Sequence, residues 1–424
     1  MQAGGEDAMG TVGGTSPARH FPVGALRRPA ALLLAAALVL LLVLPGPAAA
    51  QNGEAADPAP DRPFTVDAAA AVLLDVHTGQ ILFAQNENER LAPASLTKIM
   101  TLLLALEDID AGRVALSDRA VVSEAAWNLA GRGRPGGVSA MFLNVGDQVT
   151  LEELLYGIGV LSGNDASLVV AEHLAGSEEA FVRRMNERAA ELGLENTHFL
   201  DSHGLSPDAA TTAADMARLA AYFVRTQPDG MIYSQLPEYT YAGITQPNRN
   251  RLLLRDDRVT GLKTGYLGVA GYHLVATAES GEMSLVAAVL GAASESDRER
   301  VALELLNYGF NNFRTVAPAG DLASTTVRVY KGAADQVTVQ PGQRPVVTVA
   351  AGAVDRLQWQ VDLPPHLEAP VAEGQQVGRL AAVLDGRELA SFDIVAAAGV
   401  ERGGFFKVLV DTVRLFLAGL LGRR

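Results

Sequence analysis

Serine and lysine stand three residues apart in Ser95-Leu96-Thr97-Lys98, a spacing that puts both side chains on one face of a helix. A serine hydroxyl is a weak nucleophile until a neighbouring base removes its proton, and a lysine amine can be that base when burial or a nearby cation keeps it neutral. The alternative is an ordinary surface lysine. Lysine is scarce here, however, because the chain has only four among 34 lysines and arginines. Arginine does not lose its proton at working pH, so the choice of lysine indicates a base.

A second motif, Ser162-Gly163-Asn164, lies between an apolar stretch and a predicted helix that continues from Ala166. Once a base has taken the serine proton, a proton must reach the departing amine, and a hydroxyl can relay it. Ser162 fits that role, and the Asn164 amide can hold a substrate backbone. Serine and asparagine also favour helix N-caps, so the tripeptide by itself fits a structural role equally.

A third motif, Lys263-Thr264-Gly265, leads into a predicted strand. Its ammonium and hydroxyl could bind a carboxylate, and glycine lets a substrate backbone approach the strand edge. If Lys263 lies close to Lys98, the two like charges disfavour each other and the pKa of Lys98 falls. A lysine at an ordinary strand end would look the same alone. The three motifs in this order, however, are those of penicillin-binding proteins and class A β-lactamases.

Hydrophobic spacing predicts the elements that must position these residues. Two apolar runs, 68–74 and 81–84, flank a glycine turn and predict a strand hairpin. With Pro93 just upstream of the first, helical patterns cover 95–106, 151–174, 178–192 and 212–224. Strand patterns return over 262–278 and 283–290. Strands at both ends of a helical middle indicate an α+β domain.

A change of pattern beyond Asp321 marks a second domain. Short alternating runs follow, at 327–329, 337–339 and 357–361, and Asp385-Gly386 is a dipeptide typical of hairpin turns. We therefore predict a separate small all-β domain that ends near Ala398.

Length, charge and cysteine content narrow the functional class. A chain of 424 residues is long enough for two or more domains. The net charge of −14 is spread along the chain without a basic stripe, so nucleic acid is not an expected partner. Because there is no cysteine, a thiol nucleophile, a zinc-thiolate site and disulfides are excluded.

Residues 1–50 have the features of a secretory signal peptide. Three arginines precede an apolar run over 30–44, and the small residues after it suggest cleavage before Gln51. The run is short for a spanning helix, although an uncleaved N-terminal anchor is the alternative. In both cases the body leaves the cytoplasm, to the periplasmic or extracytoplasmic face of the cell membrane. Residues 51–63 are predicted to be a flexible linker.

From about Phe64 onward the sequence resembles the low-molecular-mass penicillin-binding proteins that act as D-alanyl-D-alanine carboxypeptidases, the peptidase S11 family. Beyond the three motifs, the likeness extends over 87–101 around Ser95 and over 139–143 before the second motif. Asp201-Ser202-His203-Gly204-Leu205 also matches, with a structural rather than catalytic role expected for His203. The resemblance implies a β-lactamase/transpeptidase-like fold for residues 64–320.

The resemblance also implies a role for each site residue. Ser95 would form the acyl-ester, Lys98 would accept its proton, and Ser162 would assist proton transfer. Substrate binding would fall to Asn164, Lys263, Thr264, Gly265, Tyr266, Arg249 and Arg298. The backbone amides of Ser95 and Tyr266 would form the oxyanion hole that stabilises the acyl-transfer intermediate. Tyr266 stands where some relatives carry histidine, a change that keeps the backbone donor but can alter pH dependence and deacylation.

The implied reaction is removal of the terminal D-alanine from peptidoglycan pentapeptides, with no metal or cofactor. Stem peptides and β-lactams would be the partners, and the oligomeric state is not readable from the sequence. One alternative is a β-lactamase, although the Glu-x-x-Leu-Asn pattern of class A enzymes is absent after Ser162. Another is a catalytically silent peptidoglycan- or penicillin-binding module. Endopeptidase activity on cross-links also remains open, because it needs the same acyl transfer.

The C-terminal residues 401–424 follow the small β domain predicted at 321–400. Apolar side chains dominate this segment, while Lys407, Asp411 and Arg414 recur on one stripe at helical spacing. An amphipathic helix that anchors the protein to a membrane surface is expected. The alternatives are a helix packed into a core and a spanning helix that ends in Arg423-Arg424.

Overall fold

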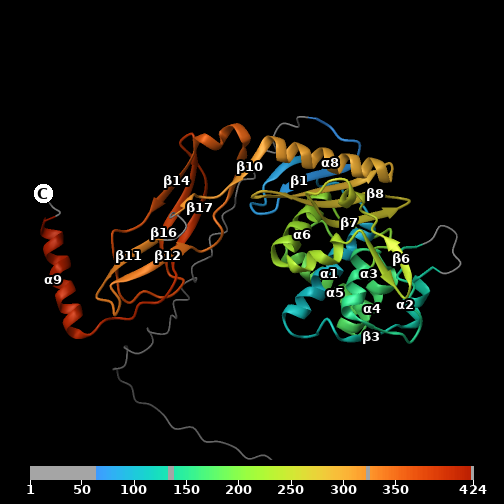
Figure 1. Ribbon diagram of the computed structural model, residues 1–424, viewed down its shortest axis with the longest axis horizontal. Coiled ribbons are helices and arrows are strands. Elements are labelled where there is room, and N and C mark those ends of the chain that lie inside the picture. Colours follow the sequence, from blue (N-terminus) through green and yellow to red (C-terminus); the bar gives the residue numbers. More distant parts are fainter. Residues whose placement is uncertain (1–63, 132–137, 321–324, 422–424) are drawn as a thin grey trace, which may run out of the picture. The chain divides into compact units, whose positions relative to one another are not determined.

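The computed structural model describes residues 64–131, 138–320 and 325–421, and Figure 1 shows an α+β domain, a small β domain and a C-terminal helix. The predicted fold class is confirmed. The predicted signal peptide over 1–50 and the linker over 51–63 lie outside the described residues.

The α+β domain is built on one antiparallel sheet with the strand order β2-β1-β9-β8-β7. These strands are β1 (Ala70–Asp75), β2 (Ile81–Gln85), β7 (Val259–Leu267), β8 (Gly271–Ser280) and β9 (Met283–Ala292). The predicted hairpin is confirmed as β1 and β2, and β1 also pairs with β9. The strand that carries the third motif, β7, therefore forms an edge of the sheet.

Alternate residues of the strands face two apolar cores on opposite sides of the sheet. On β1, Ala71 and Leu73 belong to the core that includes α8 (Glu295–Asn312), which lies along one face of the sheet in Figure 1. Val72 and Leu74 belong to the core of the other helices. Hydrophobic spacing did not place α8 among the predicted helices.

The longer helices on the other face are α1 (Lys98–Asp110), α3 (Leu151–Gly159), α4 (Asn164–Ala175), α5 (Glu178–Glu191) and α6 (Ala213–Thr226). The segment 151–174 proves to be two helices, because Ser162 adopts a left-handed φ of 59° between α3 and α4. Shorter elements complete the domain: α2 (Glu124–Leu129), α7 (Ile232–Gln235), the pair β3 (Arg119–Val121) and β4 (Gln148–Thr150), and the hairpin β5 (Glu238–Tyr241) and β6 (Ile244–Pro247).

The small β domain has its own sheet, in the order β14-β16-β17-β12-β11-β15, and its own apolar core. The strands are β11 (Thr325–Tyr330), β12 (Gln336–Pro341), β14 (Leu357–Asp362), β15 (Leu367–Glu368), β16 (Gln376–Leu384) and β17 (Arg387–Ala396). Asp385 and Gly386 both have positive φ and join β16 to β17, which confirms the predicted hairpin turn. A further pair joins β10 (Phe313–Val316), which precedes the predicted boundary at 321, to β13 (Val347–Ala350).

The last element is α9 (Phe405–Leu421), whose polar stripe is engaged within the protein. Asp411 is fully buried, and its carboxylate accepts a hydrogen bond of 2.8 Å from the backbone N–H of Lys331. Lys407 and Arg414 lie 2.8 and 3.5 Å from the same carboxylate. The apolar residues are left exposed: Phe405, Phe406, Leu409, Val410, Val413, Phe416 and Leu417. Among the described helices, none combines the length and hydropathy of a membrane span.

Candidate active site

Ser95 lies in a short 3-10 helix, Ala94–Thr97, directly before α1. The spacing predicts Ser95 at the start of the α-helix itself, whereas α1 begins at Lys98. The tighter turn follows Ala94, which has a left-handed φ of 51°. Ser95 and Lys98 nevertheless meet as the spacing predicts, since the Lys98 Nζ lies 3.1 Å from the Ser95 Oγ.

Two glycines allow backbone to approach the Ser95 turn from different segments of the chain. A Cβ on Gly204, which has a φ of 85°, would lie 1.8 Å from the carbonyl oxygen of Ala94. A Cβ on Gly265 in β7 would lie 3.2 Å from the Pro93 carbonyl oxygen and 3.3 Å from the Ser95 nitrogen. Glycine at these positions therefore lets the chain close around the turn.

A histidine on β8 also holds this turn in place. The ring of His273 is fully buried; its Nδ1 accepts from the backbone N–H of Gly291 at 2.9 Å, and its Nε2 lies 3.0 Å from the carbonyl oxygen of Ala92. Burial lowers the pKa of His273 to about 4, so the ring is neutral and donates from Nε2. His273 thus ties the residues before Ser95 to the sheet.

Lys98 is fully buried among uncharged acceptors. Its Nζ donates to the Ser95 Oγ, to the Asn164 Oδ1 at 2.7 Å and to the His203 carbonyl oxygen at 2.5 Å. Burial lowers the pKa of Lys98 to about 7, and the Arg249 cation adds to that lowering, whereas Asp201 opposes it. A substantial fraction of the amine is consequently neutral near neutral pH, as a general base requires.

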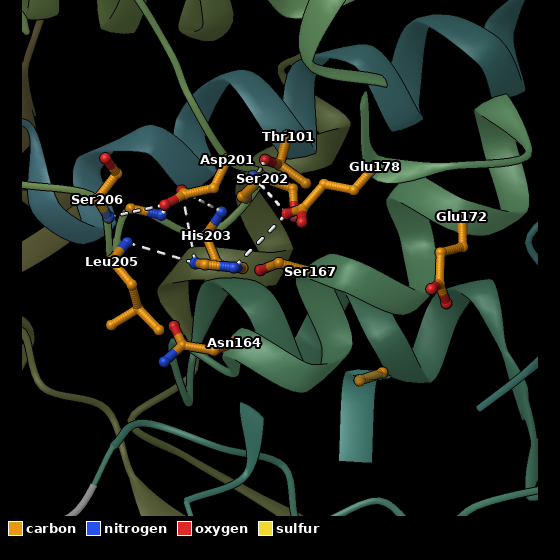
Figure 2. Close-up of polar contacts among 12 residues, drawn as sticks. Thr101, Asn164, Ser167, Glu172, Glu178, Asp201, Ser202, His203, Leu205 and Ser206 are labelled. Carbon is orange, nitrogen blue, oxygen red and sulfur yellow. Dashed lines mark hydrogen bonds and ion pairs between the residues drawn. The ribbon is translucent and has the colours of Figure 1, made fainter. Parts of the chain in front are cut away.

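The loop over 201–206 presents the His203 carbonyl to Lys98, and its polar contacts are drawn in Figure 2. The Asp201 carboxylate accepts from the backbone N–H groups of His203 at 3.1 Å, Ser206 at 2.7 Å and Gly204. On α1, the Thr101 hydroxyl donates to the Ser202 carbonyl oxygen at 2.6 Å. Asp201 and Thr101 lie in stretches that match the family, but neither was assigned a role from the sequence, although an aspartate at the start of a glycine-containing loop is a recognisable signal for such a turn.

The His203 side chain contacts its own loop and Glu178, the first residue of α5. Its Nδ1 accepts from the Leu205 N–H at 3.3 Å, and its Nε2 lies 3.5 Å from Glu178, as Figure 2 shows. Glu178 also accepts from the hydroxyl and the backbone N–H of Ser202. Burial lowers the pKa of His203. These contacts support the structural role expected for this residue.

The second motif contributes one direct contact to the cluster. Asn164, the first residue of α4, accepts from Lys98, so its carbonyl oxygen is engaged with the lysine rather than held free for substrate. Ser162 is nearly fully buried and lies in the strained turn before α4. Within the described residues no hydrogen bond joins the Ser162 hydroxyl to Lys98.

Asp165 anchors the segment that faces this turn. Its carboxylate accepts from the backbone N–H groups of Met141, at 2.8 Å, and of Leu143, at 3.2 Å. The Asn164 N–H completes the link by donating to the Ser139 carbonyl oxygen at 2.9 Å. The segment 139–143 and the second motif are therefore one hydrogen-bonded unit.

The third motif brings a second buried lysine into the site. Lys263 on β7 is nearly fully buried, and its Nζ donates to the Thr264 carbonyl oxygen at 3.2 Å. Burial, followed by the charges of Lys98, Arg249 and Arg298, holds the pKa of Lys263 well below its usual value. Because Lys98 is among the cations that lower the pKa of Lys263, the two amines lie close enough for their charges to interact. Repulsion between like charges is mutual, so each lysine disfavours the charged form of the other, in addition to the burial and the Arg249 charge that act on Lys98.

The two arginines differ in exposure and partners. Arg298 on α8 is nearly fully buried, and its guanidinium donates to the carbonyl oxygens of Gly265 at 3.3 Å and Arg249 at 3.5 Å. It also lies over the ring of Tyr272. The Arg249 side chain is exposed. Arg298 therefore braces β7, and Arg249 presents its charge to solvent beside it.

Tyr266 directly follows the third motif, whose three residues are buried, and its own side chain is 54% exposed. Its ring packs against that of Tyr272 with the centroids 4.3 Å apart. The two rings therefore pack together across the β7–β8 pair. The backbone of Tyr266 follows directly after Gly265, which approaches the Ser95 turn.

Two family models match the chain. The model described as D-alanyl-D-alanine carboxypeptidase, Peptidase_S11, matches residues 54–294, which is more than half of the chain. The model of the penicillin-binding protein 5 C-terminal domain matches residues 313–402.

Similar proteins match over most of their length. D-alanyl-D-alanine carboxypeptidase DacC of Escherichia coli K12 is 39% identical over 357 residues, covering 83% of this chain and 88% of the relative. D-alanyl-D-alanine carboxypeptidase DacF of Bacillus subtilis 168 is 34% identical over 384 residues, covering 89% of this chain and 95% of the relative.

Solved structures agree with these matches. Penicillin-binding protein 5 from Haemophilus influenzae has a TM-score of 0.69 at 35% identity, covering 81% of this chain and 100% of that one. Penicillin-binding protein D2 from Listeria monocytogenes, in its cefotaxime-bound form, has a TM-score of 0.53 at 28% identity and covers 59% of this chain and 100% of its own. The chain therefore belongs to the peptidase S11 family of serine-type D-alanyl-D-alanine carboxypeptidases.

Proposed function

We propose that this chain removes the terminal D-alanine from peptidoglycan pentapeptides through an acyl-enzyme on Ser95. The observation that carries the proposal is the contact between the Ser95 Oγ and the buried Lys98 Nζ, at 3.1 Å. A lysine whose pKa is lowered to about 7 can accept a proton from the serine. No other described residue places a base against Ser95.

Acylation begins when Lys98 takes the Ser95 proton and the oxygen attacks the carbonyl carbon of the penultimate D-alanine. The backbone N–H groups of Ser95 and Tyr266 stabilise the negative charge on the carbonyl oxygen. The bond to the terminal D-alanine then breaks, and its nitrogen receives the proton from Lys98 through the Ser162 hydroxyl. Water attacks the ester next, releasing the shortened peptide and restoring Ser95.

The positive side chains around β7 orient the substrate. We assign the carboxylate of the terminal D-alanine to Lys263, Thr264 and Arg249, with Arg298 holding Arg249 and Gly265 in position. The Asn164 Oδ1 keeps Lys98 directed at Ser95, which leaves its amide N–H groups for the substrate backbone. The same site accepts β-lactams, whose carboxylate meets the same cations.

The test is D-alanine release from a pentapeptide that ends in D-Ala-D-Ala, measured with wild type and Ser95→Ala. Wild type should release D-alanine and form a penicillin adduct, and Ser95→Ala should do neither. Turnover by Ser95→Ala would remove Ser95 as the nucleophile. A stable penicillin adduct without D-alanine release would favour a silent binding module, and rapid release of hydrolysed penicillin would favour a β-lactamase.

We also propose that the protein acts on the outer side of the cell membrane, exported by its N-terminal segment and held to the membrane surface by α9. The exposed apolar residues of α9 support this anchor, because its polar stripe faces Lys331 and leaves Phe405 and Phe406 free. Since the chain is acidic, apolar burial must dominate over attraction to anionic lipid.

Vesicle co-sedimentation tests the anchor. Phe405→Asp combined with Phe406→Asp should release the protein from vesicles and leave D-alanine release intact. Val121→Asp, at another exposed apolar side chain, is the matched control and should not affect vesicle binding. Equal vesicle binding by the double variant and the control would contradict the anchor.

A further inference from the structure

Glu178 is a carboxylate that the proposed reaction steps do not use, although it contacts the loop that faces Lys98. It is the first residue of α5, and its side chain is 27% exposed. Its Oε1 accepts from the backbone N–H of Ser202 at 2.9 Å and from the Ser202 hydroxyl at 2.6 Å. The same oxygen lies 3.5 Å from the His203 Nε2, as Figure 2 shows. One carboxylate oxygen therefore gathers three groups of the loop over 201–206.

Ser202 is held from two sides by two different helices. Its N–H and hydroxyl face Glu178 on α5, whereas its carbonyl oxygen accepts from the Thr101 hydroxyl on α1 at 2.6 Å. Thr101 follows Lys98 by three residues, so the two side chains lie on the same face of α1. Because the N–H and the carbonyl of Ser202 are both engaged, the peptide groups before and after this residue are both fixed.

The next carbonyl along the chain is the one that Lys98 contacts. A neutral amine has two hydrogens and one lone pair, and the two shortest contacts of the Lys98 Nζ are to the His203 carbonyl oxygen at 2.5 Å and to the Asn164 Oδ1 at 2.7 Å. If these two acceptors take the two hydrogens, the lone pair is left to face the Ser95 Oγ at 3.1 Å. The His203 carbonyl is thus one of two groups that aim the base at the nucleophile.

We propose that Glu178 is a positioning residue for acyl transfer, which acts by holding Ser202 and thereby fixing the His203 carbonyl that orients Lys98. The inference rests on the acyl-enzyme function proposed for Ser95 and deepens it. Within the described residues, Glu178 has no hydrogen bond to Ser95 or Lys98. Its effect on the reaction passes through the loop.

The His203 ring adds a second link between Glu178 and the loop. Its Nδ1 accepts from the Leu205 N–H at 3.3 Å, so the hydrogen of the neutral ring is on Nε2, on the side of Glu178. Burial and the Lys98 charge lower the pKa of His203, against the opposing effects of Asp201 and Glu178. The neutral ring consequently prevails at neutral pH and keeps its Nε2 hydrogen toward Glu178.

The alternative role for Glu178 is to stabilise the start of α5. Acidic side chains in the first turn of a helix interact favourably with the helix dipole. Glu179 is in the same turn and is exposed, and no hydrogen bond among the described residues joins it to the loop over 201–206. If Glu178 served only the helix, the two glutamates would be equivalent. Glu179 is therefore the matched control.

The experiment measures kcat/KM for D-alanine release and the second-order rate constant of penicillin labelling, on the full chain. Glu178→Ala should lower both by a similar factor of roughly tenfold or more, since small displacements of a catalytic group are costly. The two factors should agree because both reactions use Lys98 for the same proton transfer, although their leaving groups differ. Glu179→Ala should leave both rates within about twofold of wild type.

The conservative variant separates the contact from the charge. Glu178→Gln has the same length and keeps an oxygen that can accept from the Ser202 N–H and hydroxyl, so both rates should stay within about threefold of wild type. If Glu178→Ala does not fold, two milder variants take its place. Ser202→Ala loses only the hydroxyl and should be roughly threefold slower, and Thr101→Val should slow both reactions from the α1 side.

The outcomes separate this inference from the proposed function. Equal rates for Glu178→Ala and Glu179→Ala, or a glutamine variant as slow as the alanine variant, would show that the contact with Ser202 does not position the base, while the carboxypeptidase function stands. Wild-type rates in both Ser202→Ala and Thr101→Val would contradict the inference in the same way. If wild type neither releases D-alanine nor forms a penicillin adduct, both proposals are wrong.

Discussion

Lys98 in the α+β domain and Lys407 at the start of α9 show how surroundings decide what a lysine does. Lys98 is fully buried and contacts a hydroxyl, an amide oxygen and a backbone carbonyl. Lys407 is at the surface and lies 2.5 Å from Asp335 and 2.8 Å from Asp411. Burial lowers the pKa of Lys98 to about 7, whereas hydrogen bonds to the two carboxylates raise that of Lys407. One lysine is therefore suited to exchange a proton, and the other is suited to keep it.

The largest effect is expected when the side chain at position 98 carries a permanent positive charge, as the Lys407 side chain does in its ion pairs. Lys98→Arg should lower kcat/KM for D-alanine release by roughly 10³-fold, because a guanidinium cannot accept the serine proton. Release kinetics and penicillin labelling measure the effect. Activity close to wild type would show that another group deprotonates Ser95.

Gly204 tests the close approach of the 201–206 loop to the turn that carries Ser95. Gly204→Ala should lower the free energy of unfolding by about 2–4 kcal/mol, since left-handed strain adds to a clash with the Ala94 carbonyl. Gly79→Ala is the matched control, because Gly79 has a φ of 72° and no atom near the added methyl; it should cost only about 1 kcal/mol. Denaturant unfolding of both variants measures the difference, and equal losses would contradict the close approach.

The pH dependence of acylation tests the lowered pKa of Lys98, which distinguishes it from Lys407. The base form of Lys98 increases as pH rises through about 7. We expect kcat/KM to fall roughly tenfold per pH unit below that value and to level off above it. A profile that is flat from pH 5 to 8 would exclude Lys98 as the group that titrates.

Substitutions of Asp201, whose loop presents the His203 carbonyl to Lys98, should have smaller effects. Asp201→Asn removes a negative charge that raises the pKa of Lys98, so the rising limb of the pH profile should move to lower pH. Asp201→Ala also removes the acceptor for the loop N–H groups, and kcat should fall roughly tenfold as the His203 carbonyl loses its position. An unchanged limb in the asparagine variant would show that Asp201 acts only through loop structure.

The smallest effect is expected at the other lysine. Lys407→Gln removes ion pairs to the exposed Asp335 and to the buried Asp411, neither of which belongs to the candidate active site. We therefore expect kcat/KM for D-alanine release to stay within about twofold of wild type. A large loss of activity in this variant would show that the base of α9 influences the catalytic site.

The sequence predicted the contacts that depend on local spacing. Ser95 and Lys98 are three residues apart, so their meeting needs only one helical turn. The hairpin at Asp385-Gly386 depends on two residues with positive φ and was equally predictable. The fold class followed from strands that flank a helical middle.

Contacts between segments that are far apart in the sequence could not be predicted from local spacing. The Asp201 loop and the His273 ring acquire their roles from neighbours far along the chain. The helix α8 was missed because only the sheet determines which of its residues are buried. The burial of both Lys98 and Lys263 near the charge of Arg249 also could not be predicted from the sequence.

The pairing of β1 with β9 has a consequence for how the protein is made. These strands are separated by nearly the whole α+β domain, so the sheet cannot be completed until the last of them has been synthesised. Ser95 and Lys98 emerge early, whereas Gly265 and His273, which close on the Ser95 turn, emerge much later. A nascent chain therefore carries the nucleophile long before it carries the site, and reactivity begins only with the finished domain.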